Sequence, residues 1–200
     1  MVAIKLCGLT RRCDAVWANE CRPEYVGFVF ARSRRCVRDE QAAQLRQVLR
    51  PDIEAVGVFV NEPIDHIAAL VQRGIIQLVQ LHGTEDASYV QALRRAVSVP
   101  IIQAYSIHCQ DDMKAALQST AEFILLDHGA GGTGQPFDWT LICSVNRPYF
   151  LAGGLSPDTA ADAVRLRPYG VDVSSGIETN GVKDREKMRA FVSQVRQFSY

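Results

Sequence analysis

The sequence lacks the features that would mark a membrane or nucleic-acid-binding protein. No apolar run in its 200 residues approaches the roughly 20 needed to cross a bilayer. The first residues, Met1 to Lys5, are not followed by a long apolar core and a cleavage site, so we expect no signal peptide. The net charge is zero, from 22 basic and 22 acidic side chains. We therefore expect neither nucleic acid nor a membrane as a partner, and any attraction for anions must be local.

Close cysteine or histidine spacings are also absent. The six cysteines are scattered, and none of them forms a C-x-x-C pair. This distribution suits reduced thiols better than a disulfide framework, so we expect a cytoplasmic protein. No H-x-H or other tight ligand spacing occurs, and we predict no metal site.

What the sequence does contain is a regular alternation of short apolar segments with longer helix-like segments. Eight such pairs follow one another with connections of a few residues and no low-complexity linker. The predicted strands are Val2–Gly8, Tyr25–Phe30, Glu54–Val60, Leu78–His82, Ile101–Tyr105, Glu122–Asp127, Tyr149–Gly153 and Val171–Ser174. The predicted helices are Arg11–Glu20, Asp39–Leu49, Pro63–Arg73, Asp86–Val97, a weaker Asp111–Ser119, Trp139–Ser144, Pro157–Leu166 and Asp184–Phe198.

Strict alternation predicts right-handed crossovers and a parallel sheet. Two α/β architectures then compete, a doubly wound open sheet and a closed (β/α)8 barrel. Eight units favour closure, and 200 residues lies at the small end of the usual range for such barrels. We therefore predict a single-domain (β/α)8 TIM barrel over residues 1–200, with an active site at the C-terminal ends of the strands.

The sixth predicted strand ends in a carboxylate and a glycine-rich loop. Asp127 closes the apolar run, and Gly132 and Gly134 follow in the loop. Glycines let backbone N–H groups approach an anion closely, because no Cβ stands in the way. An acid beside such a loop suggests proton chemistry on a phosphorylated small molecule.

The last two predicted strands end in similar loops. Gly153 and Gly154 follow the seventh strand, and Ser174, Ser175 and Gly176 close the eighth. A phosphate site after strands 7 and 8 recurs in these barrels, so we predict that these residues bind phosphate. The alternative is that the glycines only make tight turns.

Cys7 ends the first predicted strand, between Lys5 and Gly8. A thiol at a polar, phosphate-binding mouth can have a lowered pKa and act as a base or nucleophile. The alternative is a buried, inert cysteine that behaves as a small hydrophobe. We interpret the other five cysteines as structural.

The ordered set of motifs resembles one enzyme family over essentially the whole chain. No single motif is decisive, but together they closely resemble phosphoribosylanthranilate isomerase, an enzyme of tryptophan biosynthesis. The motifs are Lys5-Leu-Cys7-Gly8, Gln80-Leu-His82-Gly83, Leu125-Leu-Asp127 with Gly131-Gly-Thr-Gly134, Leu151-Ala-Gly-Gly154-Leu and Val171-Asp-Val-Ser-Ser-Gly-Ile-Glu178.

The resemblance implies an Amadori rearrangement of N-(5'-phosphoribosyl)anthranilate without cofactor or metal. Asp127 matches the family's general acid, which opens the furanose ring and needs a raised pKa to do so near neutral pH. Cys7 matches the general base, which removes the C2 proton as a thiolate. Each such proton transfer typically contributes about 10²–10⁴-fold in rate.

The same resemblance implies residues that bind the substrate. Arg35 matches an arginine that pairs with the anthranilate carboxylate. The family commonly has Pro or Lys where this chain has Arg34, so either arginine could point inward. His82 and Asp172 are further substrate-binding candidates, at the aromatic pocket and at a sugar hydroxyl. A monomer and a homodimer are both compatible with the sequence.

Three other functional hypotheses are compatible with the sequence. Cys7, His82, Asp127 and His128 include the residue types that bind zinc in a metal-dependent hydrolase. A related isomerase of a histidine-pathway aminoaldose is the second, although those relatives usually carry an aspartate where Cys7 stands. A non-catalytic phosphate-binding barrel is the third.

Overall fold

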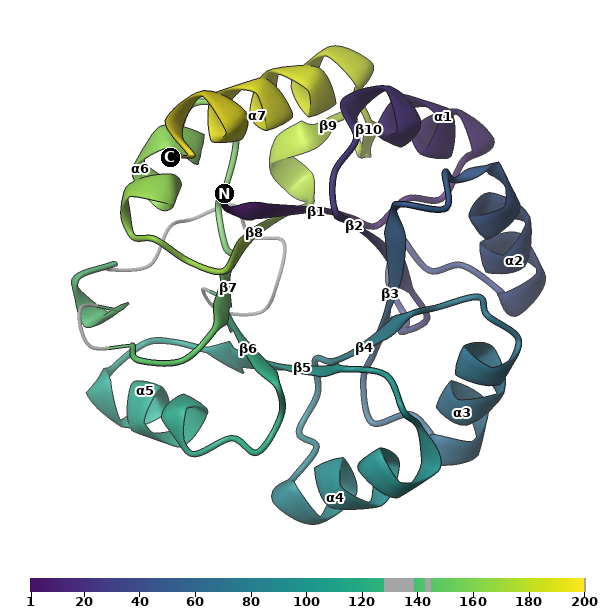
Figure 1. Cartoon of the computed structure of the whole chain (residues 1–200), viewed down its shortest axis with the longest axis vertical. Coiled ribbons are helices and arrows are strands. Elements are labelled where there is room, and N and C mark those ends of the chain that lie inside the picture. Colours follow the sequence, from purple (N-terminus) through teal and green to yellow (C-terminus); the bar gives the residue numbers. More distant parts are fainter. Residues whose placement is uncertain (128–138, 143–144, 200) are drawn as a thin grey trace.

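A closed barrel of eight parallel strands stands at the centre of the computed structural model, which describes residues 1–127, 139–142 and 145–199 (Figure 1). Each strand pairs with the next in the sequence, and Ala3 to Leu6 of the first strand pair with Gly170 to Val173 of the last. This last pairing closes the sheet, so the (β/α)8 barrel is confirmed and the open sheet is wrong. The strands are β1 (Ala3–Cys7), β2 (Tyr25–Val29), β3 (Glu54–Phe59), β4 (Leu78–Leu81), β5 (Ile101–Ser106), β6 (Phe123–Asp127), β7 (Tyr149–Leu151) and β8 (Gly170–Val173).

The helices form an outer ring around the barrel (Figure 1). They are α1 (Arg12–Cys21), α2 (Asp39–Val48), α3 (Ile64–Gln72), α4 (Ala87–Ala96), α5 (Gln110–Leu117), α6 (Ala160–Arg165) and α7 (Arg185–Phe198). The weak prediction for α5 is confirmed, since the Asp112 carboxylate accepts the backbone N–H groups of His108 and Cys109 at its start. Within residues 1–127, 139–142 and 145–199, no helix is long and apolar enough to cross a membrane.

Most predicted boundaries shift by one or two residues, and three elements are notable among them. The expected helix Trp139–Ser144 is a 3₁₀-helix, η1 (Trp139–Ile142), and residues 143–144 lie outside the described residues. Strand β7 stops at Leu151 because Gly153 and Gly154 have φ of +82° and +66°, which no strand residue adopts. Helix α6 starts late because Ser156 and Thr159 form a turn first, with the Ser156 N–H donating to Oγ1 of Thr159.

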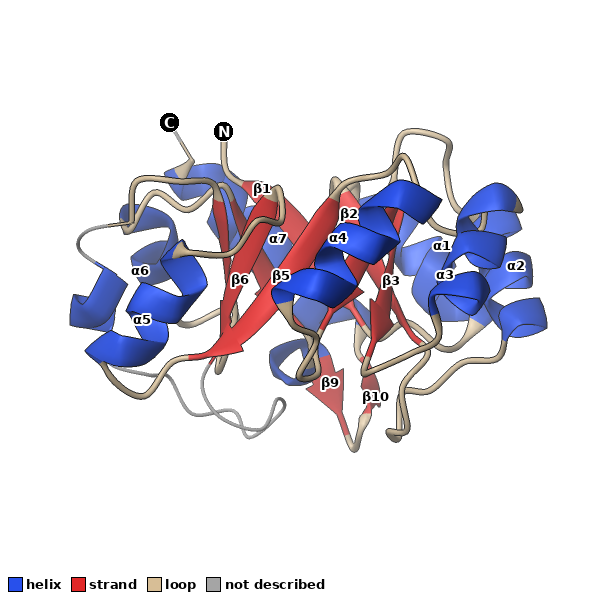
Figure 2. Cartoon of the chain, turned by 90° about the horizontal axis from the view of Figure 1, so that it is seen from below, coloured by secondary structure: helices blue, strands red, loops and turns tan. Residues whose placement is uncertain are grey.

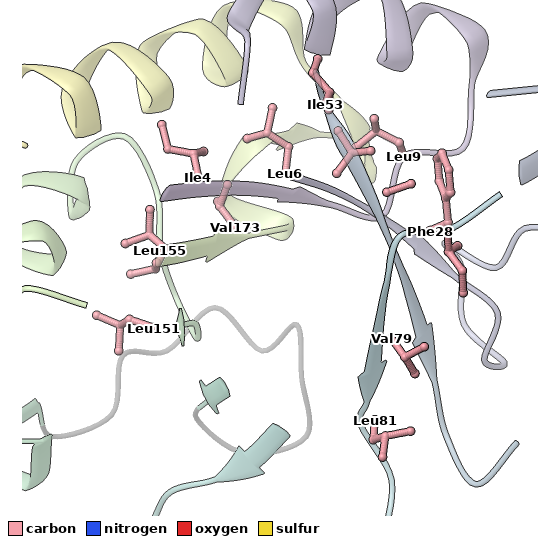
Figure 3. Close-up of a cluster of buried hydrophobic side chains, with 14 of the residues drawn as sticks. Ile4, Leu6, Leu9, Phe28, Ile53, Val79, Leu81, Leu151, Leu155 and Val173 are labelled. Atoms are coloured by element: carbon pink, nitrogen blue, oxygen red, sulfur yellow. The ribbon is translucent and has the colours of Figure 1, made fainter. Parts of the chain in front are cut away.

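The strands alternate between an outward and an inward face. Outward side chains such as Ile4, Leu6 and Val173 pack into the layer between barrel and helices (Figure 3). Inward side chains near the strand starts form an apolar layer of Ala3, Tyr25, Val56, Leu78, Ile102, Leu125 and Phe150. Further along the same inward faces comes a polar layer of Lys5, Cys7, Gln80, Asp127 and the partly buried Asp172.

A short hairpin follows β8 and was not predicted. After the 3₁₀-helix η2 (Ser175–Ile177), β9 (Glu178–Thr179) pairs antiparallel with β10 (Val182–Lys183). The turn uses Asn180 and Gly181 with φ of +51° and +80°, and Asn-Gly is a strong hairpin signal. Figure 2 shows the hairpin at the end of the barrel opposite the two chain termini, where the strands end.

Candidate active site

Two adjoining hollows open at the C-terminal ends of the strands. The larger, of about 220 Å³, is lined by residues that include Cys7, Arg35, Gln80 and His82. The smaller, of about 50 Å³, lies at the ends of β7 and β8 and is lined by residues that include Gly153, Gly154 and Ser175. Asp127, Asp172 and Ser174 line both hollows, so the two form one continuous site.

Three larger surface hollows lie elsewhere. Their volumes are about 610 Å³ beside α1 and α2, about 700 Å³ beside the chain termini and about 330 Å³ between α2 and the end of α3. Their described linings include no cysteine, histidine or carboxylate side chain. The site at the strand ends is smaller, but it gathers a thiol, two carboxylates and an imidazole. The reactive side chains therefore identify the hollows at the strand ends, and not the larger hollows, as the candidate active site.

Cys7 reaches this site from the last position of β1. A Cβ added at Gly27 on β2 would lie 2.6 Å from the Cys7 sulfur, so only glycine leaves room for it there. Burial raises the pKa of Cys7, while the ammonium groups of Lys5 and Lys183 act to lower it. The sequence allowed a lowered pKa at this position, but desolvation outweighs the nearby cations and the pKa of Cys7 is raised.

Asp127 ends β6 and is buried, with its Oδ2 atom 3.8 Å from Nε2 of His82. On the other side of the imidazole ring, Nε2 of Gln80 lies 3.0 Å from Nδ1 of His82. The Gln80 amide donates to Nδ1 when a neutral His82 carries its proton on Nε2, the nitrogen that faces Asp127. His82 thus lies beside the acid, in addition to lining the pocket.

Two buried lysines lie near Cys7, each paired with a carboxylate. Nζ of Lys5 is 3.0 Å from Oδ2 of Asp172, and the Lys5 side chain is fully buried. Nζ of Lys183 is 2.7 Å from Oε1 of Glu178. Burial acts to lower the pKa of Lys5, but Asp172 and Cys7 outweigh it and raise that pKa, whereas burial lowers the pKa of Lys183.

Of Arg34 and Arg35, Arg35 is the one that lines the pocket, together with the exposed Arg32. Its Nε and Nη2 atoms donate to the two oxygens of Glu178 at 2.7 and 3.0 Å. Arg34 reaches the same carboxylate from outside, and its side chain is 57% exposed against 15% for Arg35. A Cβ at Gly8, which has φ of +81°, would lie 2.5 Å from Cδ of Arg35, so this glycine makes room for the inner arginine.

The residues predicted to bind phosphate separate into three groups. Gly153, Gly154, Ser174 and Ser175 line the smaller hollow. Gly176 lines neither hollow, and a Cβ there would lie 1.9 Å from the Leu155 carbonyl oxygen, so close packing explains this glycine. Gly132 and Gly134 lie outside the described residues.

Four further residues are buried at the site and were not predicted to have a role there: Lys5, Gln80, Glu178 and Lys183. Two of them follow from strand periodicity. Lys5 lies two residues before Cys7 and Gln80 two before His82, which puts each on the same face as its neighbour. A charged or amide side chain at such a position in an apolar strand is therefore a sequence signal for a further site residue.

Within the part of the chain that the structure describes, no three histidine, cysteine or carboxylate side chains group as metal ligands. His128, which was also a candidate zinc ligand in the hydrolase hypothesis, lies outside that part. The described geometry therefore gives the metal-dependent hydrolase no support.

Comparison with known proteins points to one family. The family model described as N-(5'phosphoribosyl)anthranilate (PRA) isomerase matches residues 4–194. The N-(5'-phosphoribosyl)anthranilate isomerase of Endomicrobium trichonymphae is 43% identical over 201 residues, covering 98% of this chain and 99% of that protein.

Solved structures agree with the sequence comparison. The phosphoribosyl anthranilate isomerase of Thermotoga maritima superposes with a TM-score of 0.90 at 34% identity, over 98% of this chain and 100% of that one. A phosphoribosyl anthranilate isomerase in complex with reduced 1-(o-carboxyphenylamino)-1-deoxyribulose 5-phosphate is similar at a TM-score of 0.86 and 33% identity, with coverage of 98% and 100%. The chain therefore belongs to the N-(5'-phosphoribosyl)anthranilate isomerase family.

Proposed function

We propose that the chain catalyses the Amadori rearrangement of N-(5'-phosphoribosyl)anthranilate to 1-(2-carboxyphenylamino)-1-deoxyribulose 5-phosphate, a step of tryptophan biosynthesis, with Asp127 as general acid and Cys7 as general base. One observation carries the proposal. The thiol and the carboxylate line one pocket, and that pocket continues into a small polar hollow at the ends of β7 and β8. The family membership of the chain supports the same reaction.

The two hollows suggest how the substrate lies. The phosphate group occupies the smaller hollow, near Gly153, Gly154, Ser174 and Ser175. The ribose then lies where the hollows meet, near Asp127 and Asp172. Oδ1 of Asp172 is buried without a hydrogen-bond partner among the described residues, which suits an acceptor for a sugar hydroxyl. Gly132 and Gly134 remain predicted phosphate contacts.

The aromatic end of the substrate lies toward Arg35. Glu178 takes Nε–H and one N–H of Nη2 from this guanidinium. The outer edge of the guanidinium, with the N–H groups of Nη1 and the second N–H of Nη2, is the part that can bind a carboxylate in a bidentate manner. Arg35 can therefore bind the anthranilate carboxylate without releasing Glu178. His82 and the valines of the pocket wall lie on the side of the aromatic ring.

The reaction needs two proton transfers in opposite directions. Protonated Asp127 donates to the ring oxygen of the ribose, which opens the ring to an imine. The Cys7 thiolate then removes the proton from C2, and the resulting enolamine tautomerises to the ketone. Anchoring the phosphate far from C2 uses remote binding energy to hold the sugar between the two groups.

The proposal also covers the cofactor and metal requirement, the oligomeric state, the domain organisation and the cellular location. The rearrangement only moves protons within one substrate molecule, so we propose that it uses no cofactor and no metal. We propose that the chain acts as a monomer or a homodimer. The elements of the barrel run from Ala3, where β1 begins, to Phe198, where α7 ends. This span supports one barrel domain over residues 1–200. The scattered cysteines support a cytoplasmic location.

A direct assay tests the proposal. Purified chain, treated with chelator, is mixed with N-(5'-phosphoribosyl)anthranilate, and the loss of substrate fluorescence is followed together with formation of the ribulose product. We expect catalysed turnover without added metal. Substrate loss no faster than in buffer would overturn the proposed function. Turnover that appears only when a divalent metal is restored would overturn its metal-free mechanism.

A further inference from the structure

One buried charge has no part in the proposed mechanism. Lys5 lies in the middle of β1, and none of its surface is exposed. An ammonium group away from water is costly unless charged or polar neighbours offset the loss of hydration. A lysine at this position therefore calls for a specific partner, and its surroundings show two.

The first partner is Asp172 and the second is Cys7. Lys5 pairs in register with Asp172 on β8, and Nζ lies 3.0 Å from Oδ2 of that carboxylate. Lys5 and Cys7 are two residues apart on one strand, so both side chains point into the barrel. The Lys5 ammonium donates to Asp172, and its positive charge also acts on the Cys7 sulfur on the same face.

The charges around Cys7 do not balance while it is a thiol. Lys5 on β1, Lys183 on β10 and Arg35 after β2 carry three positive charges. Asp172 and Glu178 carry two negative charges and pair with these three cations. One positive charge is left over in this buried group, and a thiolate at Cys7 cancels it. Arg34 also contacts Glu178, but its side chain is mostly exposed and screened by water.

We propose that Lys5 is a positioning residue that stabilises the thiolate of Cys7, so that the buried cluster is charge-balanced when the base is ready to act. Burial acts to raise the pKa of Cys7, and among its neighbours Lys5 is the strongest group acting to lower it, with Lys183 weaker and Asp172 acting in the opposite sense. Asp127 on β6, His82 after β4 and Arg32 after β2 line the same pocket as Cys7, and the Arg32 side chain is exposed and screened by water. Asp127 is neutral in the form that the proposed reaction uses.

The inference rests on the proposed role of Cys7 as the base, but it can be tested without substrate. The rate of Cys7 alkylation by iodoacetamide reports the thiolate fraction, because only the thiolate reacts appreciably. The rate is measured from pH 6 to 11, and mass spectrometry of the peptide that contains Cys7 separates it from the other five cysteines.

Removing the ammonium charge should shift this curve. In Lys5→Met, we expect the midpoint of the alkylation curve to rise by about one pH unit or more, a tenfold loss of thiolate on the acidic side. Lys5→Arg, which keeps the charge, should stay closer to the wild type. Lys114→Met is the matched control, since it removes an exposed, paired lysine on α5 and should leave the curve unchanged.

A second variant keeps the test valid if Lys5→Met does not fold. Asp172→Asn removes the carboxylate that competes with Cys7 for Lys5, and we expect its midpoint to move in the opposite direction, to lower pH. An unshifted Lys5→Met curve, or an Asp172→Asn midpoint at or above the wild-type value, would overturn the inference. Absence of isomerase activity in the wild type would instead overturn the proposed function, and the alkylation curve would still report on Lys5.

Discussion

The apolar layer and the polar layer of the barrel interior share strands β1, β4 and β6, yet they hold opposite kinds of side chain. In the apolar layer, Phe150 packs edge-to-face against Tyr25 and Phe123, with ring centroids 5.7 and 5.6 Å apart. A few ångströms further along, Lys5 and Asp172 form a buried ion pair on strands whose first inward residues are Ala3 and Gly170. The change from packing to charge occurs within single strands of five residues or fewer.

The difference suggests that the apolar layer serves the stability of the fold and the polar layer serves the reaction. Burying apolar side chains stabilises the fold in proportion to the area removed from water. Burying charges is at best neutral for stability, even when they are paired. Buried charges that persist beside a thiol and a carboxylic acid are therefore better explained by the reaction than by the fold. Substitutions in the two layers should accordingly affect different quantities.

The largest effect on activity should come from the acid and the base. We expect Asp127→Asn and Cys7→Ser each to lower kcat by about 10²–10⁴-fold, since each removes one proton transfer. Steady-state kinetics with melting curves measures this, with Asp111→Asn and Cys109→Ser as exposed controls. If either active-site variant raised KM alone, its role would be binding rather than proton transfer.

In the apolar layer, the effect should fall on stability instead. Phe150→Ala removes a fully buried ring and should destabilise the fold by about 3–5 kcal/mol. Urea unfolding measures the loss, with the exposed Val182→Ala as control. Well below the unfolding midpoint, kcat of the folded enzyme should stay near the wild-type value. A large fall in kcat with unchanged stability would break the separation between the layers.

A smaller effect should distinguish the two arginines at the rim of the polar layer. Arg35→Lys keeps a cation beside Glu178 but loses the planar fork, so we expect KM to rise about tenfold with kcat nearly unchanged. Arg34→Lys is the matched control and should change KM little, because that side chain is largely exposed. The opposite result would make Arg34 the arginine that binds the substrate carboxylate.

The smallest effect should come from an ion pair outside the barrel. On α3, Nδ1 of His66 lies 2.8 Å from Glu62 and Nε2 lies 3.0 Å from Asp39. Partial burial acts to lower the pKa of His66, but the two carboxylates outweigh it and raise that pKa above its ordinary 6.5.

Because the folded-state pKa is the higher one, this interaction stabilises the fold fully below about pH 6.5 and is lost as pH rises through the raised pKa. These side chains are partly exposed, so the contribution should stay under about 1 kcal/mol. Urea unfolding of wild type and His66→Gln at pH 6 and pH 9 measures it. A stability difference that does not shrink at pH 9 would contradict this assignment.

Much of the molecule could be predicted from the sequence because its signals are local. The alternation of buried strands and amphipathic helices predicts the barrel, since each unit buries its apolar face only against its neighbours. Cys7, Asp127 and Gly153 could be named because each stands where a buried strand ends, and all such ends share one mouth. The Asn180-Gly181 hairpin was also predictable from a local signal but was missed.

The sequence by itself determined the order of the elements, the closure of the barrel and which residue types stand at its mouth, because periodicity and turn chemistry act between near neighbours. Only the tertiary structure decided the charge state around those residues. Lys5 meets Asp172 across 167 positions of the chain, and Arg35 meets Glu178 across 143. Burial and distance in space set the pKa of Cys7, and neither quantity is defined until the strands have closed.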